Sequence, residues 1–589
     1  MIATLVLAPL VCGLVGLLLP MRNRPLGAAL GIAGAAVSLV LTVLLLADGT
    51  REEFSTTWAR FGDLGVTLTA LVDTRALLMS LAVAVVALCV QVYSVGYLAG
   101  DGRYGPYAAQ ISIFTGAMLT VVFSGDLISL LIGWEVMGAC SYLLIAHDRT
   151  LPEAPAAAVK AFLVTRVGDI GFLLGIVLLG VTAGSFRITE VLAAVPSMSG
   201  PTVTAAALLL LAGVAGKSAQ FPLHTWLPDA MAGPTPISAL IHAATMVAAG
   251  VYVVARLFPV FAASPTALAV MAAMAGVTLL LGALAATAAD DIKRVLAWST
   301  VSQLGYMMAA LSAKAVDAAM FHLLAHAAFK ALLFLCAGSV IHAVGSNLMS
   351  RMGGLRKDMP LTFWTMTIGL GALIGLPPFV GFFSKEAVVG ALHTQPALWL
   401  AALLGVALTA WYSTRLWLLT FFGPARDAAV HAHEPGWAMR APLLLLAVPA
   451  AGLGVGALVA DYELAHLGLE LILPLALAVL GVAAAWWGWR RADAGDPAAV
   501  LGQTGPFLAS GLGLDTVQDR LVVRPVRALS RAVTFVDVSG VDGAVNGLGR
   551  ATTGAGAGLA AWHRAALPRA LAGVLVGAVL VTVTAVVFA

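Results

Sequence analysis

The chain has 589 residues, of which 61% are hydrophobic and only 10% are charged, and its mean hydropathy is +0.98. A soluble core cannot bury so much apolar sequence, so the composition excludes an ordinary soluble domain and predicts an all-α protein that crosses a membrane many times. The net charge of +3 is small and the basic residues are scattered among loops, which argues against a nucleic-acid surface.

Apolar windows of about 20 residues predict about sixteen membrane helices. The windows lie near residues 2–20, 26–47, 75–97, 107–124, 126–146, 160–183, 202–221, 236–257, 266–289, 293–311, 315–343, 361–393, 397–422, 440–459, 466–488 and 569–588. No basic region precedes the first window, so we expect a membrane helix there rather than a cleaved signal peptide.

The loops between these windows predict the orientation of the chain. Most of their basic residues fall on one side: Arg22, Arg24, Arg103, Arg149, Lys160, Lys293, Arg294, Arg351, Arg356, Lys357, Arg426 and Arg440. Lysine and arginine are in excess in cytoplasmic loops, so this side is predicted to be cytoplasmic and both termini to face outward. The alanine-rich, lysine-poor composition favours a bacterial chain, and therefore the bacterial plasma membrane.

The stretch from Leu211 to Arg256 is predicted to contain a broken helix with a lysine, Lys217, at the break. Four prolines interrupt the apolar sequence after that lysine: Pro222, Pro228, Pro234 and Pro236. Irregular backbone and a buried ammonium both need a polar cavity at membrane depth, so this stretch is expected to line one. The alternative is an ordinary loop from which Lys217 reaches out to the membrane surface.

A second interrupted helix is predicted from Gly371 to Val389, where Pro377 and Pro378 precede Lys385. Interrupted helices at corresponding positions are typical of transporters with inverted repeats, so we expect two repeats of five helices each. The predicted divisions are 107–257 and 258–425 for the repeats, 1–106 and 426–490 for further membrane helices, 491–568 for a linker with a lateral helix, and 569–589 for a final membrane helix.

The tail from Gly513 to Arg569 mixes charged and apolar residues, so it is too polar to span a membrane. An amphipathic helix along the membrane face fits this pattern, whereas the glycines between Gly540 and Gly558 favour a disordered cytoplasmic loop instead. The four cysteines of the chain stand alone in apolar runs, without the spacing of an iron–sulfur or zinc site. We therefore expect no metal cluster in this chain.

Glu135 lies in a predicted membrane helix with apolar neighbours on both sides. A carboxylate at that depth needs a cation, and Lys217 is the partner that we expect. A low-dielectric environment favours the neutral form of lysine and a nearby carboxylate favours the charged form, so movement of Glu135 would make Lys217 bind or release a proton. The alternative is a static, structural ion pair.

His322, His326 and Lys330 recur at intervals of four residues and share one face of a predicted helix. Histidine titrates near neutral pH and passes protons through either ring nitrogen, so the pattern favours a proton relay. Core histidines without a transport role and a metal half-site are the alternatives.

Four other polar residues in apolar stretches are open to two readings. His242 follows the first break and is either a link in the relay or an interior histidine. Arg166 and Asp169 lie three apart on one helix and are expected to pair with each other, in a structural or a modulating role. Lys293 either faces inward or belongs to a cytoplasmic helix junction.

Several of these stretches together resemble one family of membrane proteins. They are GWEVMGACSYLLI, KAFLVTRVGDIGFLLG, AGKSAQFPLHTWLPDAMAGPTPISALIHAATMVAAGVY, DIKRVLAWSTVSQLGYM, FHLLAHAAFKALLFLCAGSVIHA and GLPPFVGFFSKE. The chain resembles the L subunits of proton-pumping NADH-quinone oxidoreductase, complex I, over about residues 60 to 425. The resemblance implies an antiporter-like fold with two inverted five-helix repeats and a long lateral helix beside the neighbouring antiporter-like subunit.

The resemblance also implies roles for residues of this chain. Glu135 and Lys217 would form the channel pair of the first half, and Lys385 would serve the exit half-channel. Lys330 with His322 and His326 would form the central axis, and His242 and Lys293 match further channel positions. Arg166 and Asp169 match a charged pair on the sixth helix. Flavin, iron–sulfur clusters and quinone would belong to other subunits, because no site for them is visible in this chain.

Relatives with the same core leave a second possibility open. Large subunits of Mrp-type sodium/proton antiporters share it, as do subunits of energy-converting hydrogenases, photosynthetic complex I and bicarbonate-uptake complexes. Mrp subunits continue into extra C-terminal helices, and bicarbonate-uptake partners lack the long tail with its final helix. Both differences favour an L-type subunit of complex I. A third hypothesis is a membrane spacer whose channels carry nothing.

Overall fold

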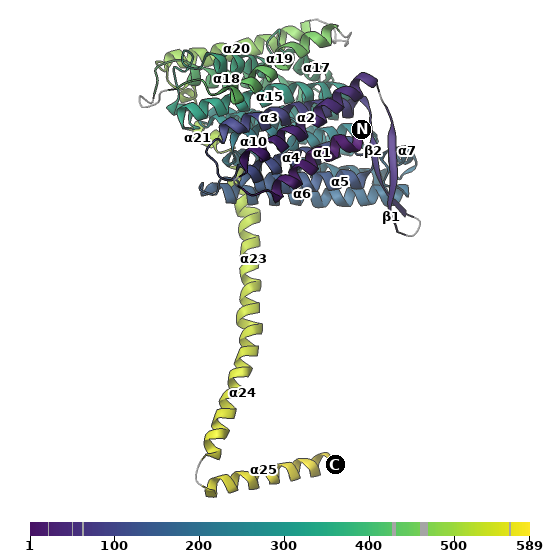
Figure 1. Cartoon of the computed structure of the whole chain (residues 1–589), viewed down its shortest axis with the longest axis vertical. Coiled ribbons are helices and arrows are strands. Elements are labelled where there is room, and N and C mark those ends of the chain that lie inside the picture. The colour runs from purple at the N-terminus through teal and green to yellow at the C-terminus, as the bar shows by residue number, and fades with distance from the viewer. Residues whose placement is uncertain (22, 50, 62–63, 427–431, 460–468, 565–566) are drawn as a thin grey trace. The chain divides into compact units, whose positions relative to one another are not determined.

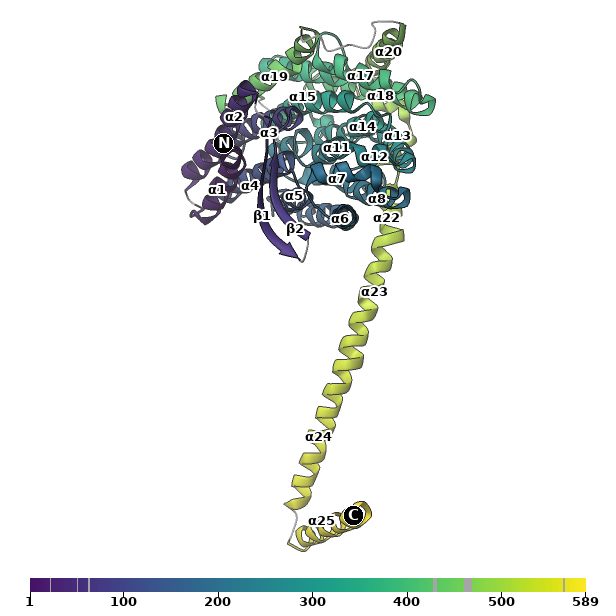
Figure 2. The ribbon, with the colours of Figure 1, turned by 90° about the vertical axis from the view of Figure 1, so that its right-hand side faces the viewer.

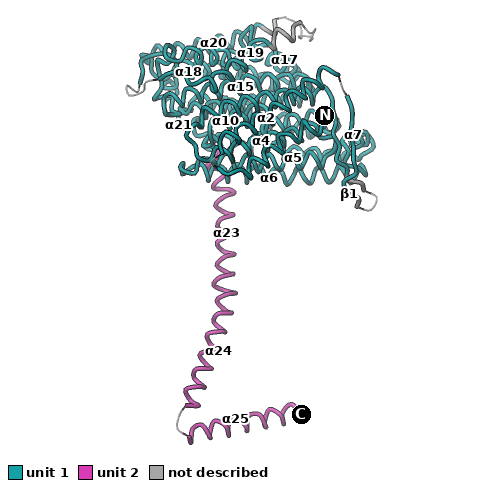
Figure 3. The backbone as a smooth tube through the Cα atoms, viewed as in Figure 1, with its two compact units in different colours: residues 1–513 teal, residues 514–589 magenta. Residues whose placement is uncertain are grey.

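The computed structural model describes residues 1–21, 23–49, 51–61, 64–426, 432–459, 469–564 and 567–589. Most of these residues form helices, as the all-α prediction requires. The chain divides into two compact units (Figure 3), which are Met1–Gly513, here unit 1, and Leu514–Ala589, here unit 2.

Twelve helices in the described part of the chain are long and apolar enough to cross a membrane. Four shorter apolar helices accompany them: Ile2–Leu18, Ile188–Ser197, Pro360–Ile374 and Trp437–Gly452. A multi-pass helical membrane protein is therefore confirmed, and the number of sixteen spans stays a prediction. Each of the sixteen apolar windows contains at least one helix in the structure.

The helices of unit 1 pack side by side in one bundle (Figures 1 and 2). The first five-span segment contains α4 (Tyr104–Phe123), α5 (Leu127–Ile145), α6 (Glu153–Ala183), α8 (Gly200–Lys217), α10 (Thr235–Ala243) and α11 (Met246–Arg256). The second contains α13 (Pro265–Ala288), α14 (Ile292–Ser312), α15 (Val316–Val344), α16 (Pro360–Ile374), α17 (Val380–Ala391) and α18 (Pro396–Phe421). The fourth span of each segment is interrupted, and the division into repeats stays a prediction.

Five more long helices complete the bundle of unit 1. They are α1 (Ile2–Leu18), α2 (Arg24–Asp48), α3 (Thr74–Tyr97), α19 (Trp437–Val459) and α20 (Leu469–Arg491). Short helices lie in the segments that connect or follow the long helices of unit 1: α7 (Ile188–Ala194), α9 (Trp226–Asp229), α12 (Phe258–Ala262) and α21 (Thr504–Ala509).

A β-hairpin that the apolar windows did not predict connects α2 to α3. Strand β1 (Glu53–Phe61) pairs antiparallel with β2 (Leu64–Leu71), and the hairpin lies across the ends of the helices on one side of the bundle (Figures 1 and 2). The backbone N–H of Thr69 donates to Asp126 Oδ2 at 2.6 Å, just before α5 begins, and Arg187 pairs with Glu53 at 2.6 Å. These bonds fix the hairpin to the residues that precede α5 and α7.

The first break follows Lys217, the last residue of α8. Bonds to other elements satisfy the polar groups that the break exposes: Phe221 N–H donates to Thr278 Oγ1 at 2.9 Å, and Trp226 Nε1 donates to Gly216 O at 2.9 Å. The second break follows Gly375, whose φ of +90° ends α16 in a left-handed conformation that glycine adopts without a Cβ clash. Both interruptions are thus built into the packing of the bundle.

Unit 2 is helical throughout its described residues. α22 (Leu514–Gln518), α23 (Arg524–Phe535) and α24 (Asp542–His563) follow one another through two π-helical turns, and α25 (Leu567–Phe588) is the last helix. In α23 the arginines and the apolar residues occupy opposite faces, as expected for an amphipathic helix. The helix prediction for this tail is confirmed, and the alternative of a loop is wrong for the described residues.

A charged clamp holds the segment after α20 against the bundle. Arg415 of α18 is 1% exposed and donates from Nε and Nη2 to the two carboxylate oxygens of Asp496, at 2.6 and 2.7 Å. Its Nη1 donates to Ala289 O at 2.7 Å. Burial raises the pKa of the Asp496 carboxyl, but the hydrogen bonds from Arg415 outweigh this effect and hold the pKa below its usual value.

Asp496→Asn is expected to lower the thermal stability of unit 1. Because the pKa of Asp496 is depressed in the folded state, the carboxylate stabilises the fold above the unfolded pKa of about 3.9, and this contribution disappears as pH falls through the folded value. Asp496 is 39% exposed, so we expect a loss of only about 1 to 2 kcal/mol at pH 7. The loss is measured by comparing the melting temperatures of the wild type and the variant in detergent, from pH 7 downward. Asp358→Asn, at an exposed position, is the control. If Asp496→Asn melted at the same temperature as the wild type at pH 7, the pair of Arg415 and Asp496 would not stabilise unit 1.

Candidate functional site

Four lysines lie inside the bundle of unit 1 with almost no exposed surface. Lys217 and Lys330 are 0% exposed, and Lys293 and Lys385 are 4% exposed. An ammonium without ligands in such surroundings costs several kcal/mol. What each ammonium touches therefore decides what it can do.

The ammonium of Lys217 lies beside a carboxylate on α6. Its Nζ is 3.2 Å from Asp169 Oδ2, and the two side chains are 0% and 1% exposed. Trp134 of α5 donates its indole N–H to the other oxygen, Asp169 Oδ1, at 2.6 Å. Lys217 is the last residue of α8, where the negative end of the helix dipole also favours a cation.

This arrangement corrects two predicted ion pairs. Glu135 pairs with Arg166 rather than with Lys217, and Asp169 pairs with Lys217 rather than with Arg166. The reason is the direction of the side chains around α6. Residues three apart point about 60° apart around the helix axis, so Asp169 faces α8 in the interior while Arg166 faces the flank of the bundle. Glu135 and Arg166 are 29% and 35% exposed, although the charge of Glu135 still reaches Lys217.

The other three lysines are held mainly by main-chain oxygens. Lys293 donates to Met231 O at 2.5 Å and to Gly233 O at 2.6 Å, both in the first break. Lys385 donates to Leu373 O at 2.7 Å, where α16 ends. Lys330 donates to Leu296 O at 3.2 Å and to the hydroxyl of Ser299. For Lys293 and Lys385, carbonyls released where helices end thus serve as ligands for the ammonium group.

The three histidines predicted for the relay are all 0% exposed. His322 and His326 share α15 with Lys330, as the sequence pattern predicts, and His242 lies in α10. The ring of His322 is fixed by Gln303 Oε1 at 3.1 Å and by Ser384 Oγ at 3.0 Å. Neither ring nitrogen of His242 or His326 makes a well-aligned hydrogen bond within the described residues.

Electrostatic interactions link these groups into one row. His242 interacts electrostatically with Lys330 and Lys293. His326 interacts with Lys330, His322 and His242. His322 in turn interacts with Lys385, one residue from Ser384 in α17. The described residues thus form a buried polar row from Lys293 to Lys385, and Lys217 with its carboxylates forms a second group where α5, α6 and α8 meet.

The prolines that the sequence assigned to the breaks lie where predicted. Pro222 lies in the segment between α8 and α9, Pro228 lies in α9, and Pro234 precedes α10. Pro377 and Pro378 lie between α16 and α17. Both helices are interrupted in the stretches that contain these prolines.

Two aromatic residues at the site escaped the sequence analysis. Trp134 looked like an ordinary core residue, and only its indole bond to Asp169 shows its place in the site. His224 is 1% exposed in the first break, and neither of its ring nitrogens makes a well-aligned hydrogen bond within the described part of the chain. Its position two residues after Pro222 was the available signal, since a titratable ring in a predicted break is a candidate for the polar pathway.

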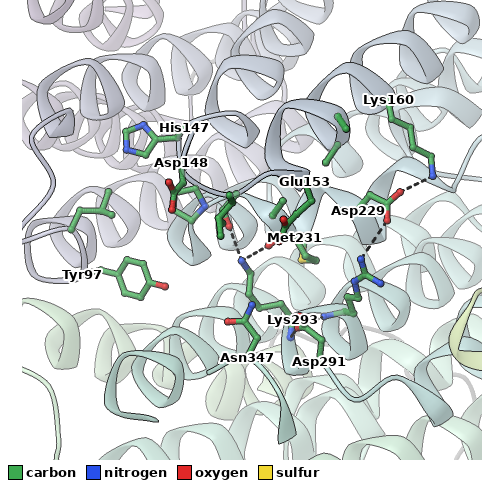
Figure 4. A pocket seen from close by; sticks show the side chains of 18 of the residues that line it. Tyr97, His147, Asp148, Glu153, Lys160, Asp229, Met231, Asp291, Lys293 and Asn347 are labelled. Atoms are coloured by element: carbon green, nitrogen blue, oxygen red, sulfur yellow. Dashed lines mark hydrogen bonds and ion pairs between the residues drawn. The ribbon is translucent and has the colours of Figure 1, made fainter. Parts of the chain in front are cut away.

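A cavity of about 540 Å³ opens beside Lys293 (Figure 4). Five carboxylates line it, against three lysine or arginine side chains and His147: Asp101, Asp148, Glu153, Asp229, Asp291, Lys160, Lys293 and Arg294. Asp229 joins Lys160 at 2.6 Å and Arg294 at 3.6 Å, so it links α9 to α6 and α14. The cavity is therefore polar, with an excess of negative charge.

Two loop carboxylates at this cavity are held in their ionised form. A hydrogen bond from the hydroxyl of Thr150 lowers the pKa of Asp148. Burial raises the pKa of Asp101, but bonds from the backbone of Arg103 and from His147 outweigh it and bring the pKa below its usual value. His147 lies 2.7 Å from Asp101. Both carboxylates therefore stay charged at neutral pH.

A metal half-site was one alternative for His322 and His326, and the described residues supply no set of ligands for it. The described residues contain no group of three or more histidine, cysteine or carboxylate side chains that could hold a metal ion. His322 also has both ring nitrogens engaged by Gln303 and Ser384. The four cysteines are free, and three of them are buried.

Two family models match this chain. Residues 124–410 match the family described as "NADH:quinone oxidoreductase/Mrp antiporter, TM", and residues 58–108 match "NADH-Ubiquinone oxidoreductase (complex I), chain 5 N-terminus". The first of these models covers all four buried lysines.

Two solved structures share the fold. A chain of the Mrp complex from Dietzia sp. aligns with a TM-score of 0.75 and 27% identity, covering 100% of this chain and 63% of that longer chain. A chain of an archaeal membrane-bound sulfane sulfur reductase aligns with a TM-score of 0.70 over 82% of this chain and 98% of its own length. It is 24% identical and so shows only the shared fold.

Curated relatives extend over nearly the whole chain. NAD(P)H-quinone oxidoreductase chain 5 of Picosynechococcus sp. is 40% identical, over 90% of this chain and 89% of its own. NADH-quinone oxidoreductase subunit L of Mycobacterium tuberculosis is 39% identical, over the same shares of the two chains. With these matches, the chain belongs to the antiporter-like membrane subunits of NADH-quinone oxidoreductase, the family of subunit L and chain 5.

Proposed function

We propose that this chain moves protons from the cytoplasm to the outside of a bacterial cell, as the L-type membrane subunit of a proton-pumping NADH-quinone oxidoreductase. Electron transfer in other subunits would drive it by changing the electrostatics of the buried lysines. The single observation that carries the proposal is the buried row from Lys293 through His242, Lys330 and His322 to Lys385, in which titratable groups follow one another across the bundle.

The cavity beside Lys293 supports a cytoplasmic entrance for the protons. It is lined by loops on the side that the positive-inside rule predicts to be cytoplasmic. With this orientation, both termini would face outward. Its excess of carboxylates attracts protons, and Lys293 stands between the cavity and the interior row. Lys217 would form the channel group of the first half together with Asp169 and Glu135, and Lys385 would serve the exit.

Other subunits would supply the chemistry that drives the pump. The relatives' names place them in quinone oxidoreductases. Flavin, iron–sulfur clusters and quinone would therefore bind in partner subunits, and this chain would contribute only proton transfer. The helical residues Leu514–His563 would lie along the neighbouring antiporter-like subunit as a lateral helix, since their apolar residues are exposed in the isolated chain.

A sodium/proton antiporter is the second candidate, because an Mrp chain shares the fold over the whole of this chain. The 40% identity to a quinone oxidoreductase chain, compared with 27% identity to the Mrp chain, favours the first candidate. Co-purification distinguishes them. Flavin and iron–sulfur subunits bound to this chain would support the oxidoreductase, and small Mrp subunits would support the antiporter.

Lys330→Ala in the assembled complex is expected to reduce the proton flux through this chain about a hundredfold or more, because a relay group is lost. The number of protons pumped per NADH oxidised, measured in liposomes, would fall to what other subunits supply. Lys357→Ala, at an exposed loop lysine, is the matched control and should pump normally. Full pumping by the Lys330 variant would show that this chain is only a membrane spacer.

A further inference from the structure

Two residues of α5 lie one helical turn apart against the ammonium of Lys217. Trp134 and Gly138 are spaced by four positions, so both face the same side of the helix. Trp134 is 0% exposed, and Lys217 Nζ is 5.8 Å from the centre of its ring. Neither residue can carry a proton at neutral pH, so a role for them has to act through their neighbours.

Trp134 holds Asp169 more firmly than Lys217 does. Its indole N–H is 2.6 Å from Asp169 Oδ1, a short, charge-assisted hydrogen bond. The ring is fixed in turn by Phe172 of α6, stacked at 4.4 Å with an angle of 11° between the rings. Lys217 Nζ lies 3.2 Å from Asp169 Oδ2, without the alignment of a hydrogen bond. The carboxylate is thus the fixed member of the ion pair, and the ammonium is the member free to move.

Gly138 provides the space for that ammonium. A Cβ at this position would lie 2.5 Å from Lys217 Nζ, closer than real Cβ contacts allow. The ammonium therefore sits directly over a glycine, and any side chain there would displace it.

We propose that Trp134 and Gly138 are positioning residues. They hold the ammonium of Lys217 beside Asp169 in the interior, and not beside Glu135 on the flank of the bundle. Glu135 is the next residue after Trp134, so α5 presents the donor that fixes Asp169 and the competing carboxylate side by side. Arg166 occupies that competing carboxylate. The inference rests on the proposed role of Lys217 in proton transfer, and it adds how the partner of Lys217 is selected.

Trp134→Phe in the assembled complex tests the hydrogen bond while keeping an aromatic ring. We expect the proton flux through this chain to fall about tenfold, as for the loss of one charge-assisted bond to a buried group, with NADH oxidation in uncoupled membranes retained. The infrared carboxylate bands of Asp169, identified as those lost in Asp169→Asn, should shift. A purely structural effect would leave those bands in place.

Trp417→Phe is the matched control. It removes an indole hydrogen bond of similar length, 2.9 Å to Thr367 Oγ1, at the contact of α18 with α16. It should leave both the bands of Asp169 and the proton yield unchanged. If Trp134→Phe also leaves them unchanged, the assignment of Trp134 is wrong.

Gly138→Ala tests the second half of the inference and does not depend on the folding of the Trp134 variant. The added methyl group should displace Lys217 and lower the proton yield, whereas Ile132→Ala, at an exposed position of the same helix, should not. Normal pumping by Gly138→Ala would overturn the role of the glycine. If Lys330→Ala pumps normally, the proposed function itself fails. If only the Lys330 variant is impaired, the positioning inference alone fails.

Discussion

Asp169→Asn is expected to impair this chain more than any other carboxylate substitution in its membrane helices. It removes the carboxylate nearest to Lys217, whose side chain is 0% exposed. An unpaired charge left in such a place costs about 3 to 5 kcal/mol, so the lysine would lose its proton or change position. Proton yield per NADH should fall as far as it does in Lys217→Ala.

Glu135→Gln provides the comparison within the same site. Glu135 and its partner Arg166 are about one third exposed, so the loss of this carboxylate is expected to have the smaller effect. Asp317→Asn, which breaks an exposed ion pair with Arg75, is the control and should be silent. If Glu135→Gln lowered the proton yield more than Asp169→Asn, the interior pairing of Lys217 would be refuted.

Gly381→Ala is expected to be among the most damaging small substitutions in unit 1. The added Cβ would lie well inside contact distance of Ala372 O, a backbone atom of α16 that cannot turn away. The two halves of the broken helix would have to separate, at a cost of about 3 kcal/mol or more. Lys385, one turn further along α17, would then lose Leu373 O as its ligand.

Gly390→Ala is a matched control in the same helix. No heavy atom lies within 4 Å of a Cβ at Gly390, and alanine favours helix more than glycine does. The melting temperature in detergent and the proton yield should both fall for Gly381→Ala and stay level or rise for Gly390→Ala. Equal behaviour of the two variants would mean that the contact of α17 with α16 does not shape the site.

The membrane helices could be predicted from sequence because the bilayer restricts which sequences can span it. A segment that spans the hydrocarbon must be long, apolar and helical, and each predicted window indeed contains a helix. The hairpin of β1 and β2 does not span the hydrocarbon, so this restriction does not apply to its sequence. Its residues alternate in polarity over short strands outside the apolar windows, so a search for long apolar runs passes over them.

The site could be predicted only in part. A charged residue in an apolar run is conspicuous, so the buried lysines and the histidines of α15 were found. Which carboxylate faces which cation depends on the rotation of each helix about its own axis, and the sequence does not carry that information locally. The pairing of Glu135 with Lys217 was wrong for this reason, and Trp134 was missed because a tryptophan in an apolar helix resembles any core residue.

The holding of Lys293 and Lys385 by main-chain oxygens affects how a mutational scan of this chain would read. A carbonyl group is present whatever the side chain, so replacing the amino acids that contribute these oxygens would seldom remove them. Sensitivity would appear instead at the glycines and prolines that shape the backbone around each ammonium. A survey confined to polar residues would therefore overlook much of what keeps these cations in place.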